Sequence, residues 1–299
     1  MKYRRLGKTG PTLSLVGIGC NNFGGRADYK VAQEVVGRAI DVGINFFDTA
    51  DSYGENATSE EFLGKALGEN RKGIVLATKF GNIIKGSGLT ERPRATKAYV
   101  KVAAEASLKR LRTDYIDLYQ MHYPDPKTPI EEALEAMNDL VWEGKVRHIG
   151  CSNFSVTQLA DAEKVAEKAG LGGFISCQNE YSLLERDEES LKPTVEAKGM
   201  GFLPYSPLAG GVLSGKYRAG QAAPKGARFS NGGRFLTEAN LKIVEDLRAF
   251  AEARGQTLLN LAFGWLAAQP WVSCVMAGAM SAAQVEQNAK AIEWLPSAT

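Results

Sequence analysis

The sequence predicts an α/β protein folded as a (β/α)8 TIM barrel with an N-terminal β-hairpin. Short apolar runs and stretches of helical periodicity alternate eight times along the 299 residues. The apolar runs lack strict polar alternation, as expected when both faces of a parallel sheet are buried. No linker or low-complexity tract interrupts the pattern. Eight uninterrupted units fit one barrel better than a doubly wound sheet, so we expect residues 1–299 to form a single domain.

The elements can be placed in chain order. Before the first strand, "RRLGKTGPTLS" predicts a hairpin that turns at 8–11 and could close the bottom of the barrel. The expected strands cover 13–19, 44–50, 73–79, 115–122, 146–152, 173–179, 200–206 and 271–278. The expected helices cover 29–43, 58–69, 95–111, 129–144, 155–170, 187–199, two stretches within 237–268, and 281–292.

Composition excludes several classes of function. With 36 basic and 34 acidic residues and no long basic block, the chain gives no reason to expect a nucleic-acid or anionic-membrane partner. No apolar stretch approaches the roughly 18 residues of a membrane span. The N-terminus has no continuous apolar signal region, so we expect mature protein there. Widely spaced cysteines without a CxxC pair predict neither disulfides nor a metal site, and favour a cytoplasmic location; they are Cys20, Cys151, Cys177 and Cys274.

A barrel places its chemistry at the carboxyl ends of its strands, and four titratable residues lie there. Asp48 and Tyr53 follow the second strand, Lys79 ends the third, and His122 ends the fourth. A lysine ammonium close to a tyrosine favours the phenolate, and an aspartate keeps that lysine charged. A histidine can orient a carbonyl oxygen by a hydrogen bond. The set predicts protonation of an alkoxide, whereas His148, within a strand, is interpreted as structural.

Each of these residues also has a purely structural interpretation. Asp48 could cap a turn, and Tyr53 could be a half-buried loop aromatic. Lys79 is harder to explain structurally, because a lysine that ends an apolar strand must be paired or desolvated.

The glycine-rich stretches after the last two strands predict a phosphate-binding site. "GIGCNNFGG" has the wrong spacing for a Rossmann fingerprint. In a barrel, phosphate is held by the loops after strands seven and eight, and "SPLAGGVLSGKY" and "AGAMSAAQ" follow those strands here. The alternative interpretation is a flexible glycine-rich loop.

The chain closely resembles the aldo-keto reductase superfamily over nearly its whole length. The resemblance rests on "LGKTG", "NFFDTADSYG", "SEEFLGKAL", "VLATKFG", "DYIDLYQMHYPD", "GKVRHIGCSNF", "QNEYSLL", "YSPLAGGVLSGKY" and "QVEQNAKAI". It implies carbonyl reduction, or alcohol oxidation, by hydride transfer with a nicotinamide cofactor. It also implies Tyr53 as the general acid/base, Asp48 and Lys79 as the groups that tune it, and His122 as the residue that orients the substrate.

The same resemblance implies the cofactor contacts. Ser152, Asn153 and Gln178 would hold the nicotinamide carboxamide, and Tyr205 would stack on its ring. The full set of implied contacts is Asn21, Asp48, Ser152, Asn153, Gln178, Tyr205, Ser206, Leu208, Gly210, Lys216, Arg228, Gly278, Gln284, Gln287 and Asn288.

The preferred form of the cofactor is less directly indicated. Many family members carry Lys, Arg or Ser where this chain reads "GAMSAAQ", so the usual basic contacts to the 2′-phosphate of NADP are missing there. Lys216, Arg228 and Gln284 could still recognise that phosphate. We therefore expect NADP(H) as the preferred cofactor and NAD(H) as the alternative.

Two functions from different classes fit the resemblance. The alternative to an enzyme is a cofactor-binding regulatory subunit like the potassium-channel β-subunits, which commonly carry asparagine at the position of His122. A metal-dependent hydrolase lacks a plausible ligand cluster. The substrate is expected to be a small carbonyl compound or alcohol in an open pocket, since the chain stops soon after Trp294. The oligomeric state is not predicted. The pocket walls are expected from Asn21, Asn22, Phe23, Phe80 and Tyr123.

Overall fold

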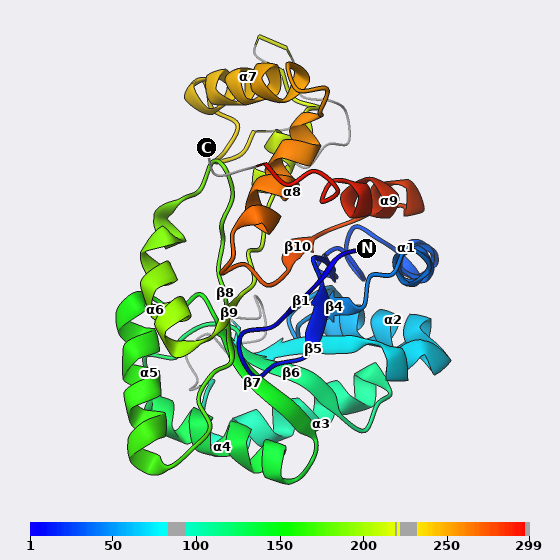
Figure 1. Ribbon diagram of the computed structural model, residues 1–299. Coiled ribbons are helices and arrows are strands. Elements are labelled where there is room, and N and C mark those ends of the chain that lie inside the picture. The colour runs from blue at the N-terminus through cyan, green and yellow to red at the C-terminus, as the bar shows by residue number, and fades with distance from the viewer. Residues whose placement is uncertain (83–93, 219, 222–231, 297–299) are drawn as a thin grey trace.

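The computed structural model describes residues 1–82, 94–218, 220–221 and 232–296 (Figure 1). Its central sheet contains eight parallel strands in the spatial order β10-β3-β4-β5-β6-β7-β8-β9. They are β3 (Val16–Gly19), β4 (Phe46–Asp48), β5 (Val75–Phe80), β6 (Ile116–Met121), β7 (Val146–Ser152), β8 (Ser176–Gln178), β9 (Gly201–Phe202) and β10 (Val275–Ala277).

Backbone hydrogen bonds connect the first and last strands of this order. The Phe202 amide of β9 donates to the Trp271 carbonyl at 3.2 Å, and the Ser273 amide donates to the Phe202 carbonyl at 2.8 Å. Both contacts join β9 to the segment that leads into β10. The parallel sheet therefore curls back on itself, and the predicted (β/α)8 fold class is confirmed.

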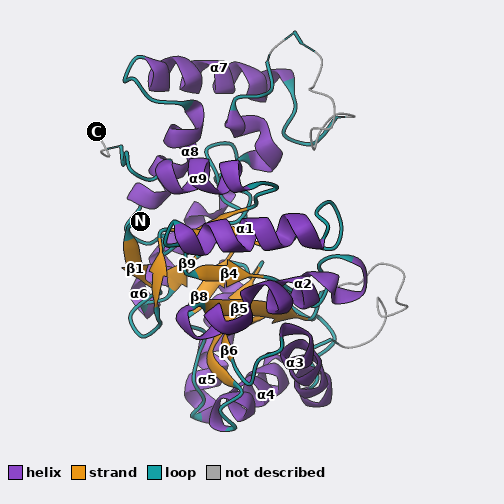
Figure 2. Cartoon of the chain, turned by 90° about the vertical axis from the view of Figure 1, so that its right-hand side faces the viewer, coloured by secondary structure: helices purple, strands orange, loops and turns teal. Residues whose placement is uncertain are grey.

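Helices follow the strands and cover the outside of the sheet (Figures 1 and 2). Several begin where a side chain accepts a hydrogen bond from the first turn; Ser155, for example, forms a reciprocal capping box with Gln158. The predicted stretch 187–199 divides into a short 3-10 segment and a helix with a proline in its first turn. The helices are α1 (Tyr29–Asp41), α2 (Thr58–Leu67), α3 (Lys97–Leu111), α4 (Ile130–Trp142), α5 (Val156–Ala169), α6 (Lys192–Lys198), α7 (Glu238–Glu252), α8 (Leu258–Ala268) and α9 (Ala282–Lys290), with 3-10 segments at Glu55–Ala57, Gly68–Gly73, Asp187–Leu191 and Ala209–Ser214.

The N-terminal hairpin closes the amino-terminal end of the barrel. Its strands β1 (Tyr3–Arg5) and β2 (Thr12–Ser14) pair antiparallel, as predicted. Leu6 and Leu13 are fully buried, in one apolar cluster with side chains from strands on different sides of the barrel. The Lys8 amide donates to the Gly199 carbonyl at 2.8 Å, just before β9. The hairpin therefore leaves the carboxyl ends of the strands as the open face.

Buried polar contacts hold the loop that follows β4 on this open face. The Asp51 amide donates to the Lys79 carbonyl at 3.1 Å. The Thr49 and Ser59 hydroxyls are 2.9 Å apart, and Ser59 also donates to the Cys20 carbonyl at 2.8 Å. These contacts fix both ends of the loop that contains Tyr53.

A buried acid joins α2 to its neighbours. The Glu60 carboxylate is completely buried, and it accepts hydrogen bonds from the Thr78 hydroxyl of β5 and, at 2.6 Å, from the Arg110 guanidinium of α3. Because the partners come from different elements, α2 cannot move without breaking a charge-assisted hydrogen bond in a dry environment.

The close packing of α2 on the end of α3 predicts opposite effects for two glycine substitutions. A Cβ atom added at Gly64 would lie 2.5 Å from the backbone of Leu111, whereas one at Gly37 in α1 would meet nothing within 4 Å. We expect Gly64→Ala to destabilise the protein by about 1–3 kcal/mol or more, as overpacking does. Gly37→Ala should stabilise it by about 0.5–1 kcal/mol. Urea unfolding of both variants measures this, and a Gly64→Ala midpoint at or above that of wild type would contradict the packing.

The buried carboxyl group of Asp51 predicts a pH-dependent stability. Burial, together with the nearby Glu60 carboxylate, raises the pKa of Asp51 from 3.8 to about 7. The folded state therefore binds this proton more tightly than the unfolded state. The associated stability is fully present below pH 3.8 and is lost as the pH rises through about 7.

Asp51→Asn removes this loss of stability at rising pH, because the asparagine side chain stays neutral. We expect the variant to gain more stability over wild type at pH 8 than at pH 5, by roughly 2 kcal/mol. Thermal melts at both pH values measure the difference, with Asp246→Asn on the exposed face of α7 as the control. A gain for Asp51→Asn that is the same at both pH values would contradict the raised pKa.

Candidate active site

The four titratable residues singled out in the sequence meet at the open face of the barrel. Asp48 ends β4, Lys79 lies in β5, His122 follows β6, and Tyr53 lies in the loop after β4. The Lys79 ammonium forms an ion pair with the Asp48 carboxylate and donates to the Thr49 carbonyl at 3.0 Å. It lies 3.4 Å from the Tyr53 hydroxyl. The Tyr53 and His122 rings meet edge to face, with centroids 5.6 Å apart.

Lys79 remains a cation although it is completely buried. Burial lowers the pKa of Lys79, but Asp48 and Tyr53 outweigh that effect, so the pKa lies above its ordinary value. Two amides complete the surroundings of Asp48, because Gln120 and Gln178 donate to its second oxygen at 2.9 and 3.3 Å. Both oxygens of the buried carboxylate therefore have partners.

Gln120 was missed in the sequence, although a signal for it was present. It is a polar residue within a fully buried strand, and it pairs in register with Lys79 on the neighbouring strand. A buried amide beside a buried lysine indicates a shared partner. That partner is Asp48.

Tyr53 is a protonated phenol at neutral pH. Burial raises its pKa above 10, Lys79 lowers it, and Asp48 raises it again. Lys79 lowers the pKa of Tyr53, as the sequence predicted, but the increase caused by burial and Asp48 is larger. Tyr53 can therefore donate a proton, and Lys79 is placed to stabilise the phenolate that remains.

His122 is a neutral imidazole. It is 5% exposed, and burial, with a smaller effect from Lys79, holds its pKa well below 6.5. A neutral ring carries a single N–H, which can donate to a substrate oxygen. The ring stacks on Tyr123 with centroids 5.1 Å apart. His148, by contrast, lies in β7 opposite Leu118 and does not line the cleft described next.

A cleft of about 760 Å³ runs from Tyr53 and His122 across the carboxyl ends of the strands to α9. This volume lies within the range of cofactor pockets. Every described residue that the resemblance implied as a cofactor contact lines this cleft, and Arg228 lies outside the described residues. The contacts in place are Asn21, Asp48, Ser152, Asn153, Gln178, Tyr205, Ser206, Leu208, Gly210, Lys216, Gly278, Gln284, Gln287 and Asn288.

A hydrogen-bonded amide in the wall of the cleft contacts the backbone of His122. Asn153 adopts a left-handed conformation (φ 61°), accepts from the Tyr205 hydroxyl at 2.8 Å and donates to the His122 carbonyl at 2.9 Å. Beside it, the Ser152 hydroxyl donates to the Gln178 carbonyl at 2.6 Å. These contacts hold an aromatic ring and several amides in the same cleft as Tyr53 and His122.

The middle of the cleft has the features of an anion site. Gly210 and Gly211 have φ values of 68° and 101°, which favour glycine. A Cβ atom at Gly211 would lie 3.0 Å from the Lys216 ammonium, so the missing side chain lets the cation lie against the backbone. Further along, Gln284 in the first turn of α9 accepts from the Met280 amide at 2.7 Å. Together, the two glycines, the lysine and the N-terminus of α9 fit the phosphates of a dinucleotide.

Two of the five residues expected to form the substrate pocket do not do so. Asn21, Asn22 and Tyr123 line the cleft, but Phe23 and Phe80 are fully buried and lie outside it, so that expectation was wrong. Phe80 directly follows Lys79, and successive residues of a strand point to opposite faces. Its ring accordingly packs on Tyr119 in the main core, with centroids 4.9 Å apart. Arg26 and Ser214 line the cleft and were not expected there.

The part of the chain that the structure describes contains neither a metal-binding cluster nor a membrane-spanning helix. Within the described ranges, no three His, Cys, Asp or Glu side chains form a group that could bind a metal. Among the helices that the structure describes, none has the length and apolarity to cross a membrane.

Over nearly its whole length the chain is similar to known proteins. The aldo/keto reductase family model matches residues 15–297. A probable voltage-gated potassium channel subunit beta of Arabidopsis thaliana is 37% identical, with 99% of this chain and 92% of the relative covered. An uncharacterized oxidoreductase of Bacillus subtilis is 36% identical (98% and 91% covered), and an L-glyceraldehyde 3-phosphate reductase of Escherichia coli O157:H7 is 31% identical (100% and 90%). The chain therefore belongs to the aldo/keto reductase family, which uses nicotinamide cofactors on small-molecule substrates.

Proposed function

We propose that the protein is an NAD(P)H-dependent oxidoreductase that reduces aldehydes and ketones to alcohols, or catalyses the reverse reaction. The observation that carries the proposal is the buried Asp48–Lys79 pair beside the Tyr53 phenol and the neutral His122 ring. These groups lie at one end of a cleft with room and donors for a dinucleotide.

Each of the four residues has a role in the proposed reaction. When bound in the cleft, a reduced nicotinamide would supply the hydride for the carbonyl carbon. Tyr53 gives its proton to the carbonyl oxygen, and the Lys79 ammonium stabilises the resulting phenolate. Asp48 keeps Lys79 charged and fixed in place. His122 donates a hydrogen bond to the substrate oxygen and so orients the carbonyl toward Tyr53.

NADP(H) is the proposed cofactor, with NAD(H) as the alternative. Lys216 supports this preference, because its ammonium lies against Gly211 in the wall of the cleft. The other proposed contacts are divided among the parts of the cofactor as the family resemblance implies. Ser152, Asn153, Gln178 and Tyr205 belong to the nicotinamide end; Ser206, Leu208 and Gly210 to the pyrophosphate; and Gly278, Gln284, Gln287 and Asn288 to the adenosine.

The second candidate function is a cofactor-binding regulatory subunit with little turnover. It is favoured by relatives named as potassium channel β-subunits, from a plant and from fission yeast. The enzyme is favoured by the complete set of four groups, His122 included, and by relatives named as oxidoreductases. Mixing the protein with NADPH and 4-nitrobenzaldehyde tests the choice. Loss of the absorbance of reduced nicotinamide supports the enzyme, and its absence with intact NADPH binding supports the regulatory subunit.

The proposal also includes the domain organisation and the cellular location of the protein. Residues 1–299 act as one domain, which is supported by the burial of Leu6 and Leu13 of the hairpin inside the barrel. The protein functions in the cytoplasm, which is supported by the four cysteines, all buried as free thiols.

Tyr53→Phe is expected to lower kcat/KM for carbonyl reduction by on the order of 10²-fold or more, because the proton donor is lost. NADPH binding should stay within a few-fold of wild type, since the ring remains in place. Stopped-flow kinetics and fluorescence titration measure the two quantities. Tyr29→Phe on α1 is the control, because its ring packs on Phe62 outside the cleft. Turnover of Tyr53→Phe close to that of wild type would exclude Tyr53 as the general acid.

Lys216→Ala is expected to weaken NADPH binding by about 10-fold or more, the size of one charge-assisted hydrogen bond. NADH binding should change far less if Lys216 contacts the 2′-phosphate. Isothermal titration with both cofactors measures the effect, with Lys242→Ala on the exposed surface of α7 as the control. Equal losses for NADPH and NADH would place Lys216 on the pyrophosphate instead.

A further inference from the structure

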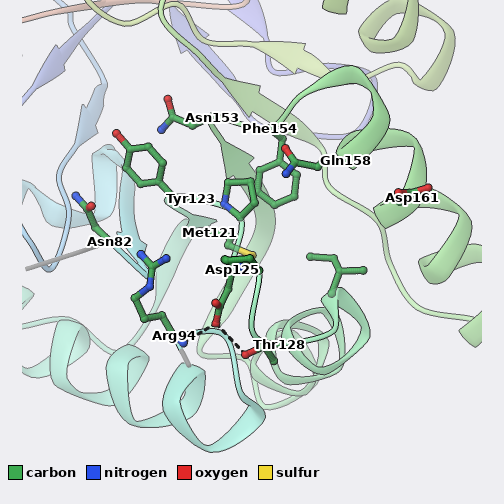
Figure 3. Close-up of a pocket in the computed structure, with 13 residues that line it drawn as sticks. Asn82, Arg94, Met121, Tyr123, Asp125, Thr128, Asn153, Phe154, Gln158 and Asp161 are labelled. Carbon is green, nitrogen blue, oxygen red and sulfur yellow. Dashed lines mark hydrogen bonds between the residues drawn. The ribbon is translucent and has the colours of Figure 1, made fainter. Parts of the chain in front are cut away.

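A second cavity of about 780 Å³ lies beside the cleft, at the carboxyl ends of β5, β6 and β7 (Figure 3). One wall runs from the end of β6 to the first residue of α4, with Tyr123, Pro124 and Ile130. The opposite wall runs from the end of β7 into α5, with Phe154 and Asp161. In Figure 3, Tyr123 and Asn82 lie across the cavity from Asp161. None of the four proposed catalytic residues lines it.

The second cavity adjoins the reaction site, because the two share lining residues. Asn82, Tyr123 and Asn153 line both the cleft and the second cavity. Tyr123 is 39% exposed, and its ring stacks on the His122 ring. A molecule bound with its carbonyl at His122 can therefore extend past Tyr123 into the second cavity.

The chemistry of the lining favours an apolar group. The accessible apolar surface of the lining comes from the exposed Tyr123 and Pro126 and the half-buried Pro124 and Ile130, with the buried Met121 and Phe154 behind them. The Asp125 carboxylate is already occupied, because it accepts from the Arg94 and Ala95 amides at 2.6 and 3.1 Å and from the Thr128 hydroxyl at 2.8 Å. These bonds hold the pKa of Asp125 below its ordinary value despite its burial. Asp125 is therefore part of the wall and not a free group for binding a ligand.

We propose that the preferred substrates are carbonyl compounds that carry an apolar, ring-bearing group, and that this group occupies the second cavity. The proposal rests on the proposed reductase function. Burial of an apolar ring against Tyr123, Pro124 and Ile130 supplies binding energy that a short aldehyde lacks. Tyr123 is then a residue that determines specificity, because both parts of the substrate pass its ring. The cofactor cleft reaches the reaction site from the other side, toward α9.

The test compares a short and a long aldehyde in variants that fill the second cavity. Wild type should show a kcat/KM for 4-phenylbutanal at least about 10-fold above that for propanal. Asp161→Trp introduces a bulky ring from an exposed position of α5, and Pro126→Trp does so from the opposite wall. Each should lower kcat/KM for 4-phenylbutanal about 10-fold, mainly through KM, and leave propanal within about two-fold. Thr157→Trp, exposed on α5 outside the cavity, should change neither value.

The outcomes separate this proposal from the proposed function. Wild type without preference for the longer aldehyde, or equal losses for both aldehydes in Asp161→Trp and Pro126→Trp, overturns the second cavity as a substrate site. If neither aldehyde is reduced, the reductase function fails, and binding of 4-phenylbutanol to wild type and both variants by isothermal titration decides about the cavity. Binding weakened by both variants supports the cavity as a site for apolar groups, and unaffected binding overturns it.

Discussion

The burial of one positive charge determines much of the arrangement at the open face. The Lys79 ammonium is completely removed from water, and an unpaired cation in that position would cost many kcal/mol. Asp48 on the neighbouring strand compensates it, and Gln120 and Gln178 satisfy the second oxygen of Asp48. Side chains of β4, β6 and β8 thus stabilise the single ammonium group that β5 places beside Tyr53. A parallel barrel can do this because its strands end together at one face.

The alternation of side chains along β5 separates two polar networks with different tasks. Lys79 points to the reaction site, whereas its neighbour Thr78 donates to the buried Glu60 of α2 on the outside of the sheet. Glu60 in turn accepts from Arg110 of α3. The inner network, around Lys79, sets the charge next to Tyr53. The outer network, around Glu60, fixes α2, the helix that follows the Tyr53 loop. A change to either network therefore affects the position of Tyr53, although only the inner one lies beside it.

The parts of the molecule that could be predicted from sequence depend on short-range patterns. The eight strand-and-helix units and the position of four titratable residues at strand ends follow from periodicity and from the rule that barrel chemistry lies at one face. Gln120 was missed because its role depends on the register between two strands, which no local pattern encodes. Phe80 was misplaced because a residue at a strand end can point inward or outward, and Lys79 already takes the inward position. The net pKa of Tyr53 depends on burial, which is a property of the folded site.

The two cavities share Asn82, Tyr123 and Asn153 and are otherwise lined by different residues, and this geometry separates two kinds of selectivity. Lys216, the glycines beside it and the first turn of α9 lie along the cleft and do not line the second cavity. Phe154 and Ile130 line the second cavity and do not line the cleft. Substitutions in either set can therefore alter the molecule bound there without moving the ion pair of Lys79. Asn153 differs from both sets, since it lines both cavities, as Asn82 and Tyr123 do, and also bonds to Tyr205 and the His122 carbonyl. A substitution of Asn153 would alter both cofactor and substrate binding, because its partners Tyr205 and His122 belong to the proposed cofactor and substrate sites.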